Sequence, residues 1–282
     1  MTELSPLGRF EQLLLATDGS EYSDGAVRLA LELAARCGAA LTVMTVVISN
    51  PEYDALAPQL AEAAGQEARD IMDRVRDQAR AAGVEVETVI RHGQEPVAEI
   101  LQQSEDMQAD LLIMGRRGRR GLARMMVGDA TGRICGMASC SVLVAPRAAQ
   151  MPRSRILVAT DGSRYSDAAA YAAGRLARLC ELPLTVVSAT LPSHSEARQA
   201  EAQEAAQRTL QAYLDDGLEA EARVDAGDRP ETAIVQAAAS TGADLIVVGS
   251  HGRSGLQKVL LGSVSERVIG AAPGPVLVVR AG

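Results

Sequence analysis

The chain has 282 residues, of which 47% are apolar, and a formal net charge of −8 at pH 7. This length is enough for two domains that each bury a core, and the acidic balance excludes general nucleic-acid binding through a basic surface. No apolar run approaches the ~20 residues that span a bilayer, and the N-terminus lacks the pattern of a secretory signal, so we expect a cytoplasmic protein without a membrane partner.

Residue usage also limits the core and its chemistry. With one Phe and no Trp, the core must be built from aliphatic side chains. The four cysteines show no Cys-x-x-Cys spacing, and three histidines show no metal-ligand spacing, so we expect reduced thiols and no zinc site.

Short β-branched apolar runs alternate with Ala-, Glu- and Arg-rich stretches of helical spacing along the whole chain. Because the runs are apolar throughout, they are typical of strands covered on both faces. The order predicts two tandem α/β domains with doubly wound, Rossmann-like folds, each a five-stranded parallel sheet between helices. The expected strands are residues 12–17, 40–47, 84–91, 110–115 and 141–145, then 154–160, 183–189, 219–225, 243–249 and 275–279.

The two halves are copies of one another. Leu14–Asp24 matches Leu157–Asp167, 143 residues later, whereas Gly93–Pro96 matches Gly227–Pro230, 134 residues later. The first copy therefore holds nine extra residues, which we place near residues 50–58.

We predict domains at residues 1–147 and 153–282, joined by a linker that contains Pro152.

A glycine pattern near the C-terminus predicts a phosphate-binding loop. Gly249 and Gly252 are followed, nine residues later, by Gly262 and Ser263, between a strand-like and a helix-like run. Glycines allow close backbone approach to an anion, and a helix start offers unpaired N–H groups and a positive dipole end. Strand 154–160 leads into Asp161, so both motifs should meet in one cleft at the carboxyl ends of the strands.

With these motifs the chain resembles the universal stress protein family, in its tandem two-domain form. The glycine pattern matches the ATP-binding subgroup of that family, and Ala159, Thr160 and Asp161 match its first-strand motif. The resemblance implies a fold with five parallel strands and a regulatory protein that binds ATP, ADP or AMP, with Mg²⁺ held through the phosphates. It also implies that the last strands, Val142–Ala145 and Val276–Val279, pair antiparallel across the two domains. A further homodimer between chains stays open.

The resemblance also implies roles for single residues. Asp161 would lie near ribose or a metal, although an Asp before Gly162 is also typical of a turn. Ala189 would contact adenine or serve as a strand-end core residue. The remaining expected nucleotide contacts are the end of the fourth strand, the loop, and the helix start: Val248, Gly249, Gly252, Arg253, Gly262, Ser263, Val264 and Ser265.

Two features of this loop have alternatives. Ser263 could bind phosphate through its hydroxyl, or serve only as a helix N-cap. Lys258, the sole lysine, could approach a phosphate or be a solvated charge, and His251 is expected to be an exposed loop residue.

In the first copy, Asp129 stands where the second copy has Ser263. A carboxylate about 4 Å from a phosphate costs on the order of 4 kcal/mol at an effective dielectric constant near 20. Nearby arginines could offset this cost, pair with Asp129 and close the site, or form a solvated face: Arg116, Arg117, Arg119, Arg120 and Arg124. We expect the first domain to bind ATP weakly or not at all.

No catalytic motif accompanies the glycine loop. The chain has no P-loop, no Gly-x-Ser-x-Gly elbow and no His-Glu-x-x-His pair. The leading hypothesis is therefore a nucleotide-binding regulator and not an enzyme. A slow Mg-dependent ATPase or phosphotransferase and a nucleotide-free dimerisation scaffold are the alternatives.

Overall fold

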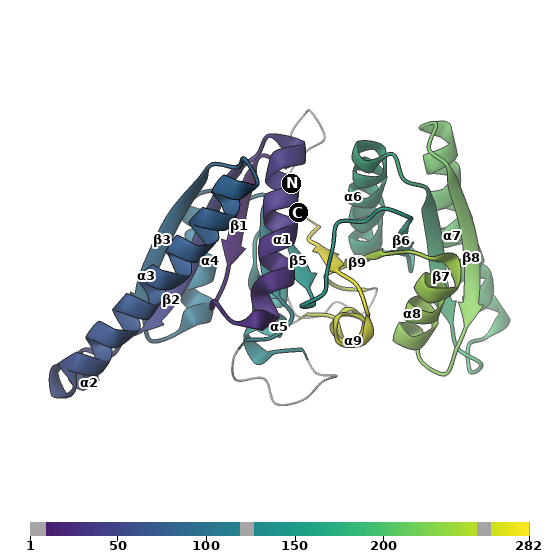
Figure 1. The fold of residues 1–282 in the computed structure, drawn as a ribbon. Helices are drawn as coiled ribbons and strands as arrows, with labels where there is room; N and C mark the ends of the chain where they lie inside the picture. Colours follow the sequence, from purple (N-terminus) through teal and green to yellow (C-terminus); the bar gives the residue numbers. More distant parts are fainter. Residues whose placement is uncertain (1–9, 119–126, 253–260, 282) are drawn as a thin grey trace.

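The computed structural model describes residues 10–118, 127–252 and 261–281, and its strands and helices alternate along both halves of the chain (Figure 1). The first half contains β1 (Gln12–Ala16), a 3-10 turn (Glu21–Ser23), α1 (Asp24–Cys37), β2 (Ala40–Ile48), α2 (Pro51–Leu56), α3 (Pro58–Ala81), β3 (Val86–Gly93), α4 (Pro96–Asp106), β4 (Leu111–Gly115), α5 (Asp129–Met137) and β5 (Ser141–Ala145). The second half contains β6 (Ile156–Ala159), α6 (Arg164–Cys180), β7 (Leu184–Thr190), α7 (Glu196–Asp215), β8 (Ala220–Ala226), α8 (Pro230–Thr241), β9 (Leu245–Gly249), α9 (Ser263–Ala271) and β10 (Val276–Val279). Every expected strand is found within two residues of its predicted bounds, which confirms the α/β fold class.

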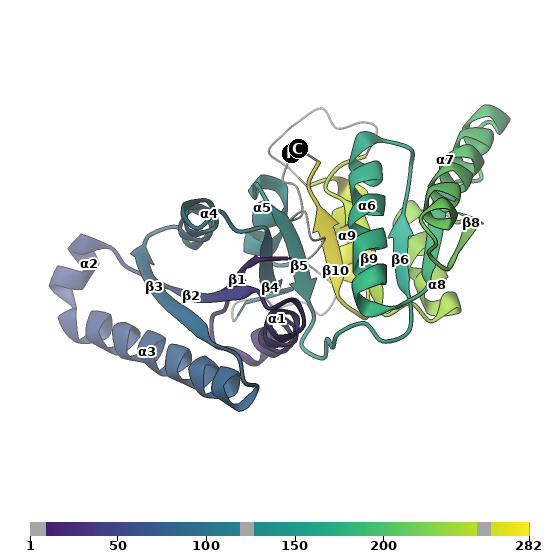
Figure 2. The same cartoon turned by 90° about the horizontal axis from the view of Figure 1, so that it is seen from above.

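The strands form one ten-stranded sheet in the order β3-β2-β1-β4-β5-β10-β9-β6-β7-β8. Within each half all neighbours are parallel, as crossover helices require. At the centre β5 and β10 pair antiparallel, with Val144 opposite Val276 and Val142 opposite Val278. The sheet is therefore continuous through the middle of the molecule (Figure 2).

Two layers of apolar side chains cover the two faces of this sheet. In β1, Leu13 and Leu15 belong to one layer and Leu14 and Ala16 to the other, because successive strand residues point to opposite faces. Helices α1, α3, α6 and α7 contribute to the first layer, and α4, α5, α8 and α9 to the second. Each layer runs through both halves, so the two halves share their core.

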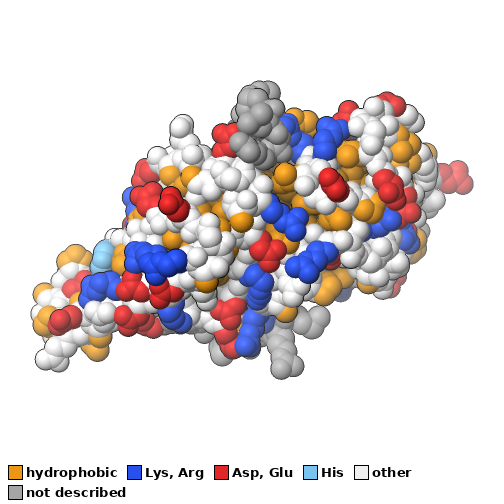
Figure 3. Space-filling model, turned by 45° about the horizontal axis from the view of Figure 1, so that its top comes forward, with side chains coloured by type: hydrophobic (Ala, Val, Ile, Leu, Met, Phe, Trp, Pro, Cys, Tyr) orange, Lys and Arg blue, Asp and Glu red, His pale blue; other side chains and the backbone are white. Residues whose placement is uncertain are grey.

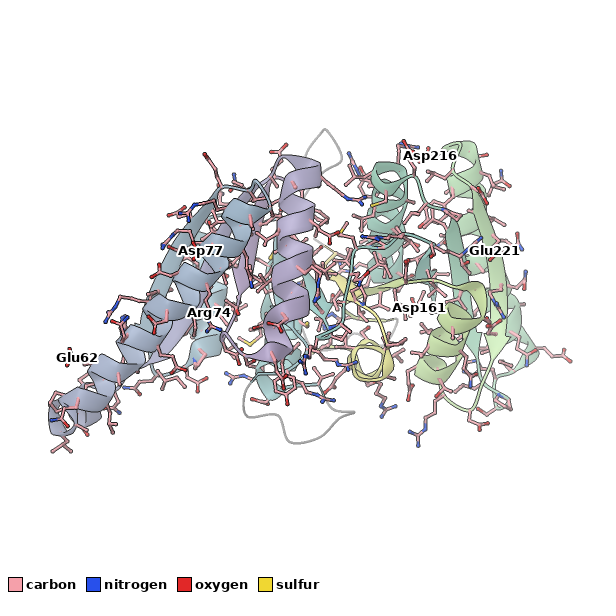
Figure 4. All side chains as sticks on the ribbon, viewed as in Figure 1. Glu62, Arg74, Asp77, Asp161, Asp216 and Glu221 are labelled. Carbon is pink, nitrogen blue, oxygen red and sulfur yellow. The ribbon has the colours of Figure 1, made fainter. Side chains whose placement is uncertain are left out.

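The extra residues of the first half lengthen one edge of the molecule. Helix α3 has 24 residues where α7 has 20, and the six-residue α2 precedes it. Both helices project beyond the β3 edge in Figure 1. Polar side chains cover the outer face of α3, as Glu62, Arg74 and Asp77 show in Figure 4.

The segment between β5 and β6, which connects the two halves, packs against the first core layer. Ala149 and Met151 are buried in the first core layer, with exposed fractions of 4% and 3%. Arg28 of α1 donates hydrogen bonds to the carbonyl oxygens of Arg147 and Ala149. The connection thus holds the two halves in one arrangement.

The surface carries charges of both signs. On the face shown in Figure 3, basic and acidic side chains are interspersed and do not gather into one basic surface. Among the described helices, none is long and apolar enough to cross a membrane.

Candidate functional site

The second glycine loop joins the end of β9 to the start of α9. The first hydrogen bond within α9 runs from the N–H of Glu266 to the oxygen of Gly262, at 2.9 Å. The N–H groups of Ser263, Val264 and Ser265 therefore have no acceptor within the helix, at its positive dipole end. Such an end is suited to an anion.

The structure corrects one interpretation of Ser263. Gly262 is the N-cap of α9, with φ −61° and ψ 136°, and Ser263 is the first helical residue. The alternative that Ser263 is a plain N-cap is therefore wrong, because its hydroxyl lies one position beyond the cap. Its side chain is exposed at the mouth of the loop.

Two glycines of the motif allow the loop to approach the start of α6 and the turn that follows β6. A Cβ atom on Gly249 would lie 2.7 Å from the carbonyl oxygen of Tyr165. A Cβ atom on Gly252 would lie 2.8 Å from Oδ2 of Asp161. The ends of β6 and β9 thus meet, as the strand order requires.

Asp161 also stabilises the turn that follows β6. Its Oδ1 accepts a hydrogen bond from the N–H of Ser163 at 3.0 Å, and Gly162 has a positive φ of 75°. Asp18 does the same in the first half with the N–H of Ser20, also at 3.0 Å. The turn-forming role is thus present in both copies, while Oδ2 of Asp161 points toward the glycine loop.

Ser265 has a contact that sequence reasoning missed. Its hydroxyl donates a hydrogen bond of 2.7 Å to the carbonyl oxygen of Gly249, and only 7% of the residue is exposed. Thr131 makes the corresponding bond to Gly115 at 3.2 Å. These bonds connect the start of each helix to the end of the preceding strand. Because the hydroxyl of Ser265 is used in this way, its backbone N–H is the group that could bind a ligand.

His251 is not the exposed loop residue that the sequence suggested. It is 9% exposed, its ring centroid lies 5.0 Å from that of Tyr165, and its Nδ1 is 3.1 Å from the hydroxyl of Ser250. The packing of the loop against α6 buries it. Arg253 and Lys258 lie outside the described residues.

The remaining expected contacts lie where β6, β7 and β9 end. Ala159 ends β6, and the next residue, Thr160, is buried and shares a 3.2 Å hydrogen bond with Ser166. Ala189 is partly buried one residue before the end of β7, and Val248 is buried one residue before the end of β9. Parallel strands bring these ends to the same edge of the sheet as Asp161 and Gly249.

Glu231 is a buried acid that the motif search did not single out. It is 5% exposed at the start of α8, and its Oε1 lies 3.6 Å from a guanidinium nitrogen of Arg267. Its Oε2 is buried and has no hydrogen-bond partner among the described residues. Aligning Gly93–Pro96 with Gly227–Pro230 places Val97 opposite Glu231, and this difference was the available signal.

The first domain has a cavity of about 740 Å³ at the carboxyl ends of β1, β2 and β4. Its apolar wall includes Met44, Val46, Ile71, Val97 and Met114, and the ionisable groups along it are Asp18, Glu67, Glu95, Asp129, Arg117 and Arg133. This volume is in the range of small-molecule sites. The cavity lies at the position that corresponds to the second glycine loop.

Asp129 occupies the first position of α5, next to this cavity. Its side chain is 89% exposed, and its Oδ2 is 4.0 Å from Arg133, which lies closer to Glu95 at 3.1 Å. Of the two nearby arginines that the structure describes, Arg117 lines the cavity and Arg116 does not. Arg119, Arg120 and Arg124 lie outside the described residues.

Arg116 contacts the other domain and not Asp129, which counts against one of the three alternatives considered for these arginines, that of pairing with Asp129. Its guanidinium donates to carbonyl oxygens at the end of α9 in the other domain, the shortest contact being 2.8 Å to Ala272. Burial, and secondly the charge of Arg117, lower the pKa of Arg116 below its ordinary value.

The described residues contain no group of three or more His, Cys, Asp or Glu side chains that could hold a metal ion. Burial raises the pKa of the Cys135 thiol to about 12 and that of Cys140 to about 11, so neither is a nucleophile near neutral pH. The groups that the described part of the site offers are backbone N–H groups, hydroxyls and a carboxylate.

Comparison with known proteins matches the sequence of both halves to one family. The model of the universal stress protein family matches residues 9–146 and again residues 152–280. A universal stress protein of Mycolicibacterium smegmatis is 31% identical over 290 residues, covering 95% of this chain and 96% of that protein. A universal stress protein of Mycobacterium tuberculosis is 35% identical over 198 residues, or 66% of each chain.

A solved structure shares the whole fold. The universal stress protein from Archaeoglobus fulgidus superposes with a TM-score of 0.78 at 23% sequence identity, covering 96% of this chain and 98% of that one. The tandem arrangement of the two halves is thus found in an experimental structure as well.

Proposed function

The chain belongs to the universal stress protein family, and we propose that it is a regulatory protein of the stress response that binds an adenine nucleotide, foremost ATP, in its second domain. The observation that carries this proposal is the start of α9. Three backbone N–H groups without helical acceptors follow Gly262, beside the exposed Ser263. Together they fit the oxygens of a phosphate.

The surrounding residues fit the rest of a nucleotide. Asp161, with Oδ2 directed toward Gly252, supplies a carboxylate that can accept hydrogen bonds from ribose hydroxyls. Ala189 and Val248 offer small apolar surfaces at the strand ends, suited to a base. Mg²⁺ would arrive with the phosphates, because the described residues provide no cluster of ligands of their own.

The first domain, in this proposal, binds ATP weakly or not at all. Asp129 places a negative charge at the helix end where Ser263 offers a hydroxyl. Its carboxylate already complements the positive end of α5, which reduces the attraction of that end for another anion. The cavity beside it therefore favours ligands other than polyphosphates.

In this proposal the site serves regulation and not turnover. In the second loop the hydroxyl of Ser250 lies 3.1 Å from Nδ1 of His251, but both residues are buried, with exposed fractions of 1% and 9%. Nucleotide occupancy would then act by changing the conformation of the loop or the choice of partner. We further propose a cytoplasmic protein, whose assembly into a homodimer is open to measurement by light scattering.

The test is the nucleotide content of the purified chain, measured by denaturing it and quantifying adenine nucleotides by chromatography. About one nucleotide per chain is expected, with Ser263→Asp as the variant that should lose it. Two per chain would contradict the role given to Asp129. None, together with no calorimetric response to Mg-ATP, Mg-ADP or AMP, would favour a dimerisation scaffold, and sustained phosphate release abolished by Asp161→Ala would favour a slow ATPase.

A further inference from the structure

Arg116 connects the glycine loop of the first domain to a helix of the second. Its Nη1 lies 2.8 Å from the carbonyl oxygen of Ala272, 3.3 Å from that of Ile269 and 3.4 Å from that of Gly270. These carbonyl groups lie at the C-terminal end of α9, where no following helical N–H group donates to them. A guanidinium there satisfies them and complements the negative end of the helix dipole.

The backbone of Arg116 is held firmly in the first domain. Its N–H donates to the carbonyl oxygen of Ala145 at 2.9 Å, at the end of β5. Its carbonyl oxygen accepts from the N–H of Gly128 at 3.1 Å and from the hydroxyl of Thr131 at 3.3 Å. The position of the guanidinium therefore follows the position of the Gly115–Gly128 loop.

The antiparallel junction explains why this contact can form. Helix α9 leads from the end of β9 back toward the start of β10, so it runs opposite to the strands of its own domain. Because β5 and β10 are antiparallel, the last turn of α9 lies at the same end of the sheet as the carboxyl end of β4. Arg116 is the first residue after β4, so it lies beside that last turn. The first turn of α9, with Ser263, lies at the other end.

The second glycine loop makes no equivalent contact to α5 of the first domain through the residue that corresponds to Arg116. The counterpart of Arg116 in the second glycine loop is Ser250, which is too short to cross the junction. The end of α5 instead accepts a hydrogen bond from Arg280, whose Nη1 lies 2.6 Å from the carbonyl oxygen of Gly136. Arg280 follows β10 and is not part of a glycine loop.

We propose that Arg116 is a positioning residue for the nucleotide site of the second domain. By fixing the C-terminal end of α9 it sets where the N–H groups of Ser263, Val264 and Ser265 meet the phosphates. This inference rests on the proposed function above. The first domain then contributes a residue that influences the nucleotide site of the second. Arg116 is next to Arg117, which lines the first cavity, so a ligand in that cavity could alter the nucleotide affinity of the second domain.

The experiment compares two arginines that make the same kind of contact to different helices. Calorimetry with Mg-ATP and with adenosine is carried out on the full chain, on Arg116→Ala and on Arg280→Ala. Arg116→Ala is expected to weaken Mg-ATP about tenfold while adenosine affinity changes less than about twofold, because adenosine has no phosphate to meet α9. Arg280→Ala, which releases α5, should leave both affinities unchanged within about twofold.

A purely structural role would give a different pattern. Equal weakening of Mg-ATP by both variants, or equal weakening of Mg-ATP and adenosine by Arg116→Ala, would overturn the inference, as would an unchanged affinity. Arg116→Lys, which keeps a cation at the helix end, should recover part of the affinity and serves as the test variant if Arg116→Ala does not fold. Absence of binding to the unaltered chain would overturn the proposed function as well, which separates the two failures.

Discussion

Asp129 and Ser263 occupy the same position in the two halves, each as the first residue of a helix that follows a glycine N-cap. The caps have nearly the same conformation, with φ −62° and ψ 143° at Gly128 and φ −61° and ψ 136° at Gly262. The backbone that would receive a phosphate is therefore alike in both domains. What differs is a carboxylate against a hydroxyl.

An exchange of these two residues should move the nucleotide preference. Asp129→Ser is expected to raise the number of bound nucleotides from about one to about two per chain, and a variant that gains no second nucleotide would contradict the role given to Asp129. Ser263→Asp should weaken binding about tenfold to a hundredfold, because a carboxylate as exposed as Asp129, at 89%, is partly screened by water. Calorimetric stoichiometry and affinity for Mg-ATP measure both effects.

Ser263→Ala is the control for this pair, since it removes a hydroxyl without adding charge. We expect a loss of only a few-fold. If Ser263→Ala weakened binding as much as Ser263→Asp, the explanation by charge would fail.

The contact between Gly252 and Asp161 gives a second prediction. A Cβ atom at Gly252 would lie 2.8 Å from Oδ2 of Asp161, so Gly252→Ala should displace this carboxylate and weaken Mg-ATP binding about tenfold. Gly118→Ala is the matched control, because its Cβ would lie 3.1 Å from Oδ2 of Asp18 in the other domain. Calorimetry should show no change in that control, and a similar loss in both variants would show that the effect is not local.

Glu231 gives a prediction about stability. Its Oε2 is buried without a partner among the described residues, whereas its ion-pair partner Arg267 is 58% exposed. Glu231→Val, which introduces the residue type found at Val97, should raise the free energy of unfolding by about 1 kcal/mol, since Arg267 can remain in water. Denaturant unfolding measures it.

The converse change, Val97→Glu, should lower the free energy of unfolding by about 2 kcal/mol or more, because it buries an acid whose nearest base along the cavity, Arg133, is already paired with Glu95. An increase in stability for Val97→Glu, or a large loss for Glu231→Val, would contradict this account. Measuring the Mg-ATP affinity of Glu231→Val at the same time shows whether Glu231 also contributes to nucleotide binding.

The buried thiols predict how stability depends on pH. Burial raises the pKa of Cys135 to about 12 and of Cys140 to about 11, from an ordinary value of 9.0. Below pH 9 both thiols are protonated in either state, so they leave stability unchanged. Above pH 9 the unfolded chain loses these protons first, and each thiol should lower the free energy of unfolding by roughly 1 kcal/mol per pH unit until its folded pKa is reached.

Alkylation at pH 8 checks the same point by another route. Cys37, Cys135 and Cys140 are buried and should not react in the folded chain, whereas the partly buried Cys180 should react slowly. Burial also raises the pKa of Cys180, against the opposing charge of Arg36. Rapid labelling of Cys135 without unfolding would contradict the burial described above.

Local patterns predicted the fold and the start of α9, because they reside in a few consecutive residues. Apolar β-branched runs define the strands within two residues, and the glycine before Ser263 defines the helix start. The repeat itself predicted the position of the extra segment that became α2 and the longer α3.

Contacts across the junction could not be predicted in this way. Arg116 and Ala272 are 156 residues apart in the chain, and nothing near Arg116 indicates which carbonyl it reaches. The burial of His251 likewise depends on how its loop packs against Tyr165. Both result from the docking of complete elements, for which the sequence has no short-range signal.

The antiparallel pairing of β5 and β10 determines which surfaces of the molecule a ligand and a partner protein can reach at the same time. Since the two sets of parallel strands point opposite ways, their loops open at opposite poles of the sheet. A protein that docks over one pole leaves the other exposed to solvent. The proposed nucleotide at one pole would therefore not compete for the same surface with a protein that docks at the other.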